Sequence, residues 1–214
     1  MKSIRKFYFK CRKSDTNVIQ LVLRFLYYKM FYRKNLLVHQ NAKIKGVKNI
    51  DSNHIIEIGT RHVGFIYKAD CTYLNIEGKF IIEGKYSIGR GCRINVGKNG
   101  IVKIGKGGFI NCNTNIIIMN SLTIGDNCVI SWDCQFLDED FHNIDYDGKS
   151  ISDSSIRIGK NVWIGCGAKI YKGSVIPDGC IVASDSIVKG VFKESNALIA
   201  GHPAKVIKNE VSWS

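Results

Sequence analysis

Aliphatic residues recur at every sixth position between residues 158 and 189. They are Ile158, Ile164, Ile170, Ile176, Val182 and Val188, and a compact side chain follows each of the first five by four positions: Val162, Ala168, Ser174, Cys180 and Ser186. A period of six is a multiple of the alternation of a strand and is out of phase with the helical turn of about 3.6 residues. Each unit supplies one short strand and one tight turn, and three units close a coil of about 18 residues. The repeat therefore predicts a parallel β-helix.

The same phase extends upstream with slips in its spacing. Ile88 and Ile104 are 16 residues apart, and Ile104 and Ile124 are 20 apart, so these coils are expected to be irregular. Earlier isoleucines place the start of the coils near residue 42: Ile44, Ile50, Ile58 and Ile76. We predict the β-helix over residues 41–199, a helical or capping segment over residues 1–40 and a C-terminal cap over residues 200–214. Caps are expected because open coil ends expose unpaired backbone groups.

A polar, acidic segment interrupts the repeat between Phe136 and Ile158, which are 22 residues apart. We predict that residues 138–156 form a loop that leaves the coil. Irregular loops on a rigid scaffold often carry functional residues. This loop is therefore the first place to look for chemistry.

Positive charge concentrates at the N-terminus. Of the formal net charge of +13, residues 1–34 carry +9, from ten Lys or Arg and one Asp. Residues 16–33 predict a helix with one apolar face, formed by Val18, Leu21, Val22, Phe25 and Leu26. It is flanked by further aromatic residues: Tyr27, Tyr28, Phe31 and Tyr32. Two compatible interpretations follow, a cap over the first coil and an interfacial helix at an anionic membrane surface.

The pattern of this N-terminal segment argues against other roles. Gln20, Arg24 and Lys29 interrupt its apolar stretch, and no small-residue cleavage site follows it, so neither a transmembrane helix nor a signal peptide is predicted. Nucleic-acid binding is not expected, because the charge lies beside an apolar stripe without a recognition motif. We expect a cytoplasmic protein, with a peripheral position at the inner face of the membrane as the alternative.

Eight cysteines form neither a zinc motif nor a disulfide pattern. No Cys-x-x-Cys pair and no Cys-His cluster with ligand spacing is present. Cys92, Cys128, Cys134 and Cys180 occupy the compact position of the repeat, where a thiol packs like a small apolar group. We expect structural thiols in a reducing compartment, and no bound metal.

Three segments resemble the hexapeptide-repeat acyltransferases. They are Ile-Gly-Lys-Asn-Val-Trp-Ile-Gly-Cys-Gly-Ala-Lys-Ile at residues 158–170, Val-Ile-Pro-Asp-Gly-Cys at 175–180 and Ala-Gly-His-Pro-Ala-Lys at 200–205. The resemblance covers residues 76–208 and is strongest to the galactoside, maltose and xenobiotic acetyltransferases and their polysaccharide O-acetyltransferase relatives. It implies an all-β fold, a left-handed parallel β-helix with an N-terminal basic helix and a short C-terminal cap.

The resemblance also implies a mechanism. It implies a homotrimer that binds acyl-CoA between neighbouring subunits and transfers the acyl group directly, using a histidine ahead of the Ile-Gly-x-Asn-Val-Trp segment as general base. His142 is the residue that matches. The chemistry leads to the same residue, because a hydroxyl nucleophile needs a base and histidine titrates near neutral pH. Asp140 is the first candidate to fix its tautomer, ahead of Asp138, Glu139 and Asp145.

Candidate residues for the acyl donor follow the loop. Backbone N–H groups of Gly165, Cys166 and Gly167 are candidates to stabilise the thioester oxyanion, since glycine-bearing corners allow close approach. The resemblance implies further contacts, to the pantetheine arm, the donor backbone and its phosphates, from Trp163, Ala183, Ser184, Lys189, Pro203 and Lys205. A trimer-interface aromatic is the alternative for Trp163, and solvated charge is the alternative for the two lysines.

The expected function is acetyl-CoA-dependent O-acetylation of a sugar or glycan hydroxyl. Candidate acceptor contacts are Asn111, Asn113, Asn115 and Asp138. A non-catalytic β-helix scaffold is one alternative, and it would need neither His142 nor the Gly-x-Pro-Ala-Lys element. A metal enzyme of the γ-carbonic anhydrase kind is the other; it requires three converging histidines, and the five in this chain lack coil spacing.

Overall fold

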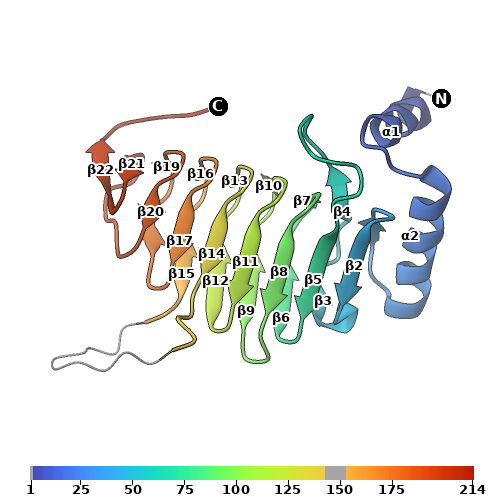
Figure 1. Ribbon diagram of the computed structural model, residues 1–214, viewed down its shortest axis with the longest axis horizontal. Coiled ribbons are helices and arrows are strands. Elements are labelled where there is room, and N and C mark those ends of the chain that lie inside the picture. The colour runs from blue at the N-terminus through green and yellow to red at the C-terminus, as the bar shows by residue number, and fades with distance from the viewer. Residues whose placement is uncertain (1, 143–152) are drawn as a thin grey trace.

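The strands stack into three sheets that form the faces of a prism, with two helices at its N-terminal end (Figure 1). This computed structural model describes residues 2–142 and 153–214, and for residues 2–4 and 6 the helical backbone alone. The chain visits the faces in turn, so that three strands make one coil. Apart from the final hairpin, neighbouring strands within each sheet are parallel.

The first face consists of β1 (Leu36–Val38), β4 (Ile56–Arg61), β7 (Tyr86–Gly89), β10 (Phe109–Ile110), β13 (Val129–Ile130), β16 (Trp163–Ile164), β19 (Ile181–Val182), β21 (Leu198–Gly201) and β22 (Ala204–Lys208). The second face consists of β2 (Ala42–Lys45), β5 (Thr72–Ile76), β8 (Arg93–Val96), β11 (Asn115–Ile118), β14 (Gln135–Leu137), β17 (Lys169–Tyr171) and β20 (Ile187–Val188). The third face consists of β3 (Ile50–Asp51), β6 (Lys79–Ile82), β9 (Ile101–Ile104), β12 (Ser121–Ile124), β15 (Ile156–Ile158) and β18 (Val175–Ile176), and a short 3₁₀ helix, Val47–Asn49, precedes β3.

Each coil has three edges, which we name by the faces they join. The first edge joins the first and second faces, the second edge joins the second and third, and the third edge returns to the first face. Ile158 pairs with Ile176, one coil of 18 residues later, which confirms three six-residue units per coil. The stack begins at Leu36 rather than near residue 42, because β1 already pairs with β4 in register.

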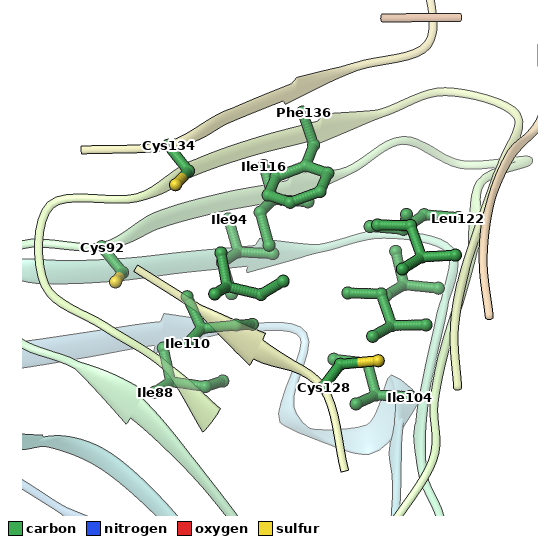
Figure 2. Packing of buried hydrophobic residues seen from close by; sticks show 14 of the residues in the cluster. Ile88, Cys92, Ile94, Ile104, Ile110, Ile116, Leu122, Cys128, Cys134 and Phe136 are labelled. Atoms are coloured by element: carbon green, nitrogen blue, oxygen red, sulfur yellow. The ribbon is translucent and has the colours of Figure 1, made fainter. Parts of the chain in front are cut away.

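Aliphatic side chains at the repeat positions fill the prism (Figure 2). Ile88 and Ile110 stack on the first face, and Ile94 and Ile116 on the second, each at most 1% exposed. Burying one such side chain contributes about 1.5–3 kcal/mol. A column of these residues therefore supplies a continuous core along the whole stack.

Thiols at the edges of the coils point into the same core (Figure 2). Sγ of Cys128 donates to the carbonyl of Gly159 at 3.0 Å, and Sγ of Cys134 to that of Gly165 at 3.2 Å. Burial raises the pKa of Cys128 to about 11 and that of Cys134 to about 12. These thiols stay protonated at neutral pH, which confirms their structural role; all eight cysteines are free.

Two helices, α1 (Lys2–Lys13) and α2 (Val18–Tyr32), precede the coils. The Asn17 side chain caps α2 by accepting from the Gln20 N–H at 3.1 Å. α2 packs along β1, so the expected cap over the first coil is present. Within the described chain, neither helix combines the length and apolarity needed to cross a bilayer.

The buried side of α2 includes only part of the predicted apolar face. Leu21 and Tyr28 are buried, whereas Val22 and Leu26 of the predicted face are exposed. Arg24 explains the difference, because its guanidinium lies on the packed side and donates to the carbonyl of Ala42 at 2.7 Å. The helix is rotated about its axis so that Arg24 faces the coils, and its other apolar side is left exposed.

Buried polar groups tie the junction of the two helices to the coils. Arg90 is fully buried; its Nε donates to the Gly59 carbonyl at 3.3 Å and its Nη2 contacts the Ser14 carbonyl. The same Nη2 lies 2.7 Å from Nε2 of His39, which is also 3.2 Å from the carbonyl of Asp15. Burial, assisted by Arg90, lowers the pKa of His39 to about 4.

Candidate active site

The loop at the second edge is anchored by Asp138, which follows β14. Its carboxylate accepts three backbone N–H groups of the preceding coil, from Met119 at 2.7 Å and from Asn120 and Ser121 at 2.8 Å. Burial raises the pKa of the Asp138 carboxyl, and these N–H groups offset part of that rise. The structure contradicts the expectation that Asp138 contacts the acceptor, because both carboxylate oxygens are used inside the fold.

His142 lies four residues beyond this anchor, with its side chain exposed. The residue before it, Phe141, has a φ of 62°, in the left-handed region that aromatic residues rarely adopt. Asp140 forms an ion pair with Lys172, which follows β17 in the next coil. Asp138 and Asp140 therefore hold the start of the loop at two points, and the histidine projects from the held segment.

The structure leaves one part of the loop prediction open. Asp140 is positioned by Lys172, and its role in orienting His142 stays a prediction. Glu139 caps the turn instead of facing the histidine, because its Oε1 accepts from the Asp140 N–H at 2.9 Å. Asp145 lies outside the described residues.

The first edge gathers most of the candidate donor residues. Trp163 lies on β16, and Cys166 lies at the turn that follows, with Ser184 at the corresponding turn one coil later. The corners are bonded in a stack, since the Asp185 N–H donates to the Cys166 carbonyl at 2.8 Å. Cys166 is half-buried and Ser184 is exposed, so the edge is open to a ligand.

Two of the three predicted oxyanion donors are already used. The N–H of Gly165 donates to the Val182 carbonyl at 2.8 Å, and that of Gly167 donates to the Trp132 carbonyl at 3.1 Å. These bonds belong to the stacking of the coils, so the structure contradicts an oxyanion role for both. The N–H of Cys166 makes no hydrogen bond within the described part of the chain and remains a candidate.

The environment of Trp163 includes residues that the sequence pattern did not indicate. Its Nε1 donates to Oγ of Ser131 at 3.1 Å, which fixes the indole against the preceding coil. The ring of Trp213 lies 6.2 Å from it, between centroids, held by an Nε1 bond to the Asn161 carbonyl at 2.8 Å. Trp213 lies beyond the repeat, so no periodicity could have placed it here.

The remaining candidates spread over the prism. Asn111 and Asn113 lie on the first edge two coils before Cys166, where the Asn111 side chain accepts from the Cys112 N–H at 3.0 Å. Asn115 lies on the second face, in β11. An acceptor role for these amides stays a prediction.

The expected phosphate contacts also separate. Lys205 and Pro203 belong to the terminal hairpin on the first face, whereas Lys189 follows β20 at the second edge. All three side chains are exposed. One chain therefore presents Lys189 to a different edge from the other donor candidates.

His142 and the donor candidates Trp163 and Cys166 occupy different edges of the prism. His142 projects from the second edge, whereas Trp163 and Cys166 lie on or beside the first edge, and the second face separates them. Hence one subunit by itself does not bring them together. Among residues 2–142 and 153–214, no group of three or more His, Cys, Asp or Glu side chains is placed to hold a metal ion.

Comparison with known proteins identifies the class. No protein-family model matches the chain. It is 38% identical over 206 residues to an uncharacterized 24.8 kDa protein in the cps region of Klebsiella pneumoniae, covering 95% of this chain and 92% of the relative. It is 27% identical over 147 residues to the putative lipopolysaccharide biosynthesis O-acetyl transferase WbbJ of Escherichia coli strain K12, covering 64% and 74%.

Among solved structures, the polysialic acid O-acetyltransferase OatWY superposes with a TM-score of 0.55 at 22% identity, covering 84% of this chain and 86% of the other. Fold and sequence together define an acetyltransferase built on a left-handed parallel β-helix. The chain belongs to the hexapeptide-repeat acyltransferases and is close to the polysaccharide O-acetyltransferases.

Proposed function

We propose that this protein transfers an acetyl group from acetyl-CoA to a hydroxyl of a saccharide. The acceptor class is supported by the similarity to WbbJ, named for lipopolysaccharide biosynthesis, and by the fold shared with OatWY, named for polysialic acid. The observation that carries the proposal is His142, exposed on a loop whose start is fixed by Asp138 and by the Asp140–Lys172 pair. A general base that receives its acceptor from solvent has to be exposed, and its backbone has to be held in place.

The proposed transfer proceeds in one displacement. A ring nitrogen of His142 takes the proton of the acceptor hydroxyl as its oxygen attacks the thioester carbonyl carbon. The new C–O bond forms, the C–S bond breaks, and the departing thiolate takes up the proton that the histidine holds. The N–H of Cys166 is the donor that this chain offers to the oxyanion.

We propose that the working unit is a homotrimer, because His142 and Cys166 lie on different edges of one prism. A neighbouring subunit with a parallel axis would set its first edge against the loop of the second edge. Each site would then combine the base of one chain with the donor contacts of the next. In this arrangement the surface around Trp163 both contacts the neighbouring subunit and forms part of the shared active site.

The test is His142→Ala, assayed for acetyl transfer from acetyl-CoA to a panel of oligosaccharides. Turnover should fall by about two to four orders of magnitude, the usual contribution of a general base. Donor affinity and the unfolding temperature should stay near wild type, because the side chain is exposed. His54→Ala, which removes another exposed histidine, is the matched control. Near-normal turnover in His142→Ala would rule out His142 as the general base, whereas a wild type without transfer activity would favour the scaffold alternative.

We propose that α2 also places the enzyme at an anionic membrane surface on the cytoplasmic side. One side of the helix packs on the coils, and the other exposes apolar side chains, including Leu23 at 60%, Met30 at 72% and Phe31 at 66%. The adjacent α1 ends in basic residues, Lys10, Arg12 and Lys13. An apolar stripe beside basic charge fits a lipid interface.

A further inference from the structure

A cavity of about 580 Å³ lies between α1 and the first face of the N-terminal coils. Phe7 and Lys13 line it from the helix, and Leu37, Arg61 and Lys85 line it from the coils. The volume is in the range of sites for small ligands, about 300–1,000 Å³. The cavity spans the first four coils, whereas the candidate donor residues lie on the sixth and seventh coils and the terminal hairpin, so it is a separate feature.

The wall of this cavity carries surplus positive charge. Lys10 is neutralised by Glu57, whose carboxylate lies 2.7 Å from its Nζ. Lys13, Arg61 and Lys85 form no ion pair with any residue that the structure describes. The local charge is therefore positive with no internal anion to balance it, a condition that favours an anionic ligand.

Arg61 and His62 show how this charge is held. The Arg61 guanidinium lies over the Phe109 ring, 3.5 Å from its centroid, so its position is fixed before a ligand arrives. Burial lowers the pKa of His62, and the neighbouring charges of Arg90 and Lys13 lower it further. An arginine held in place before binding and a histidine surrounded by positive charge are features expected of an anion-binding site.

One hydroxyl in the wall lacks a partner. Oγ of Ser87 is buried, and it finds no hydrogen-bond partner within residues 2–142 and 153–214. Burying a hydroxyl without a hydrogen bond is unfavourable. An unpaired hydroxyl in the wall of a cavity indicates that a bound ligand, or water bound with it, forms the missing hydrogen bond.

The cavity is also partly apolar. Phe7 and Ile55 line it while 37% and 40% exposed, and Leu37 on β1 lines it as well. A free inorganic anion gains nothing from these side chains, whereas an alkyl chain attached to the anion is stabilised in proportion to the apolar area that it buries. The ligand therefore has a charged head and an apolar body.

We propose that this cavity binds the phosphate group of a phosphorylated lipid, with Lys13, Arg61 and Lys85 around the phosphate and Phe7 and Ile55 along the chain. A phosphate presents several acceptor oxygens to several cationic and hydroxyl donors at once. The site is open beside α1, next to the surface proposed to meet the membrane. The proposal does not depend on acetyl transfer.

Isothermal titration of the full-length protein with dodecyl phosphate, below its micelle concentration, tests the site. The wild type should bind dodecyl phosphate, and should bind inorganic phosphate and dodecyl maltoside at least about tenfold more weakly. If inorganic phosphate bound as tightly as dodecyl phosphate, the proposal that the ligand is a lipid would be wrong. If dodecyl maltoside bound as tightly, the proposal that the ligand has an anionic head would be wrong. Absence of dodecyl phosphate binding would overturn the whole proposal.

Two variants locate the binding. Lys85→Glu should weaken the binding of dodecyl phosphate about tenfold or more. Lys98→Glu makes the same charge change at the exposed second edge and should leave this binding unchanged. Ser87→Ala should weaken binding several-fold without lowering the unfolding temperature of the free protein, since it removes an unpaired hydroxyl. Equal weakening by Lys85→Glu and Lys98→Glu, or no weakening by Lys85→Glu, would contradict the assignment.

Discussion

His39 is buried where the helical segment meets the first coil, and protonation of its ring would change the charge of that junction. Its Nδ1 accepts from the Asn41 N–H at 3.1 Å and its Nε2 lies 2.7 Å from the Arg90 guanidinium. A proton on this ring would place a second positive charge beside Arg90 without water to screen it. Burial and this charge hold the pKa of His39 at about 4.

The junction should therefore lose stability in mild acid. Above a pH of about 6.5, His39 is neutral in both the folded and unfolded states. Between about 6.5 and 4 the unfolded chain takes up a proton that the folded chain refuses, so the free energy of unfolding falls by up to about 1.4 kcal/mol per pH unit. Urea unfolding at several pH values should show a shallower fall in His39→Gln, which does not titrate. Identical pH dependence in both proteins would contradict this account.

Glycines that follow the aliphatic position on the third face explain the regularity of the coils. A Cβ at Gly125 would lie 2.6 Å from the backbone carbon and oxygen of Gly159 in the next coil, and Gly105 faces Gly125 and Asp126 in the same way. Backbone of one coil therefore occupies the space that a side chain of the previous coil would need. Gly105 and Gly125 therefore leave no room for a Cβ.

Gly125→Ala should lower the free energy of unfolding by about 1–3 kcal/mol or more, because the stacked backbones have to move apart. Gly64→Ala is the matched control, since a Cβ there meets nothing within 4 Å. Its effect should stay within about 0.5 kcal/mol. Urea unfolding of both variants measures the difference. Equal stabilities would show that the coils adjust freely at this edge.

The uncovered side of α2 leads to a prediction at the level of the helix. Met30→Glu places a charge on an exposed part of the apolar stripe and should weaken binding to anionic phospholipid vesicles about tenfold. The fold should survive, because Met30 is 72% exposed. Ile101→Glu, on the exposed third face, is the control and should bind vesicles like wild type. Vesicle co-sedimentation decides between the membrane role and a cap alone.

For the whole molecule, the separation of His142 from Trp163 predicts activity only in an assembly. Light scattering should show a trimer, and His142→Ala and Trp163→Ala should complement each other when their subunits are mixed by refolding. At sub-saturating acetyl-CoA, about a quarter of the interfaces in a random mixture combine both intact residues, so activity should return to about a quarter of wild type. Activity that stays at the average of the two variants, or a fully active monomer, would place the whole site within one chain.

The repeat alone was enough to predict the architecture of this protein. A period of six with aliphatic and compact residues in phase is compatible with short parallel strands and incompatible with a helix, so Ile158 to Val188 predicted three faces per coil. The motif after the loop predicted the family in the same way. Both signals can be read from the sequence without knowing which groups meet, because each coil repeats the same short pattern of residues.

Only the tertiary structure decided which polar groups are free. Asp138 and the N–H groups of Gly165 and Gly167 have the chemistry of site residues, but bonds to neighbouring coils use them. Likewise, Arg24 set which side of α2 is buried, and Trp213 reached Trp163 from beyond the repeat. These outcomes depend on partners far away in the sequence, whose positions follow from how the coils stack and not from periodicity.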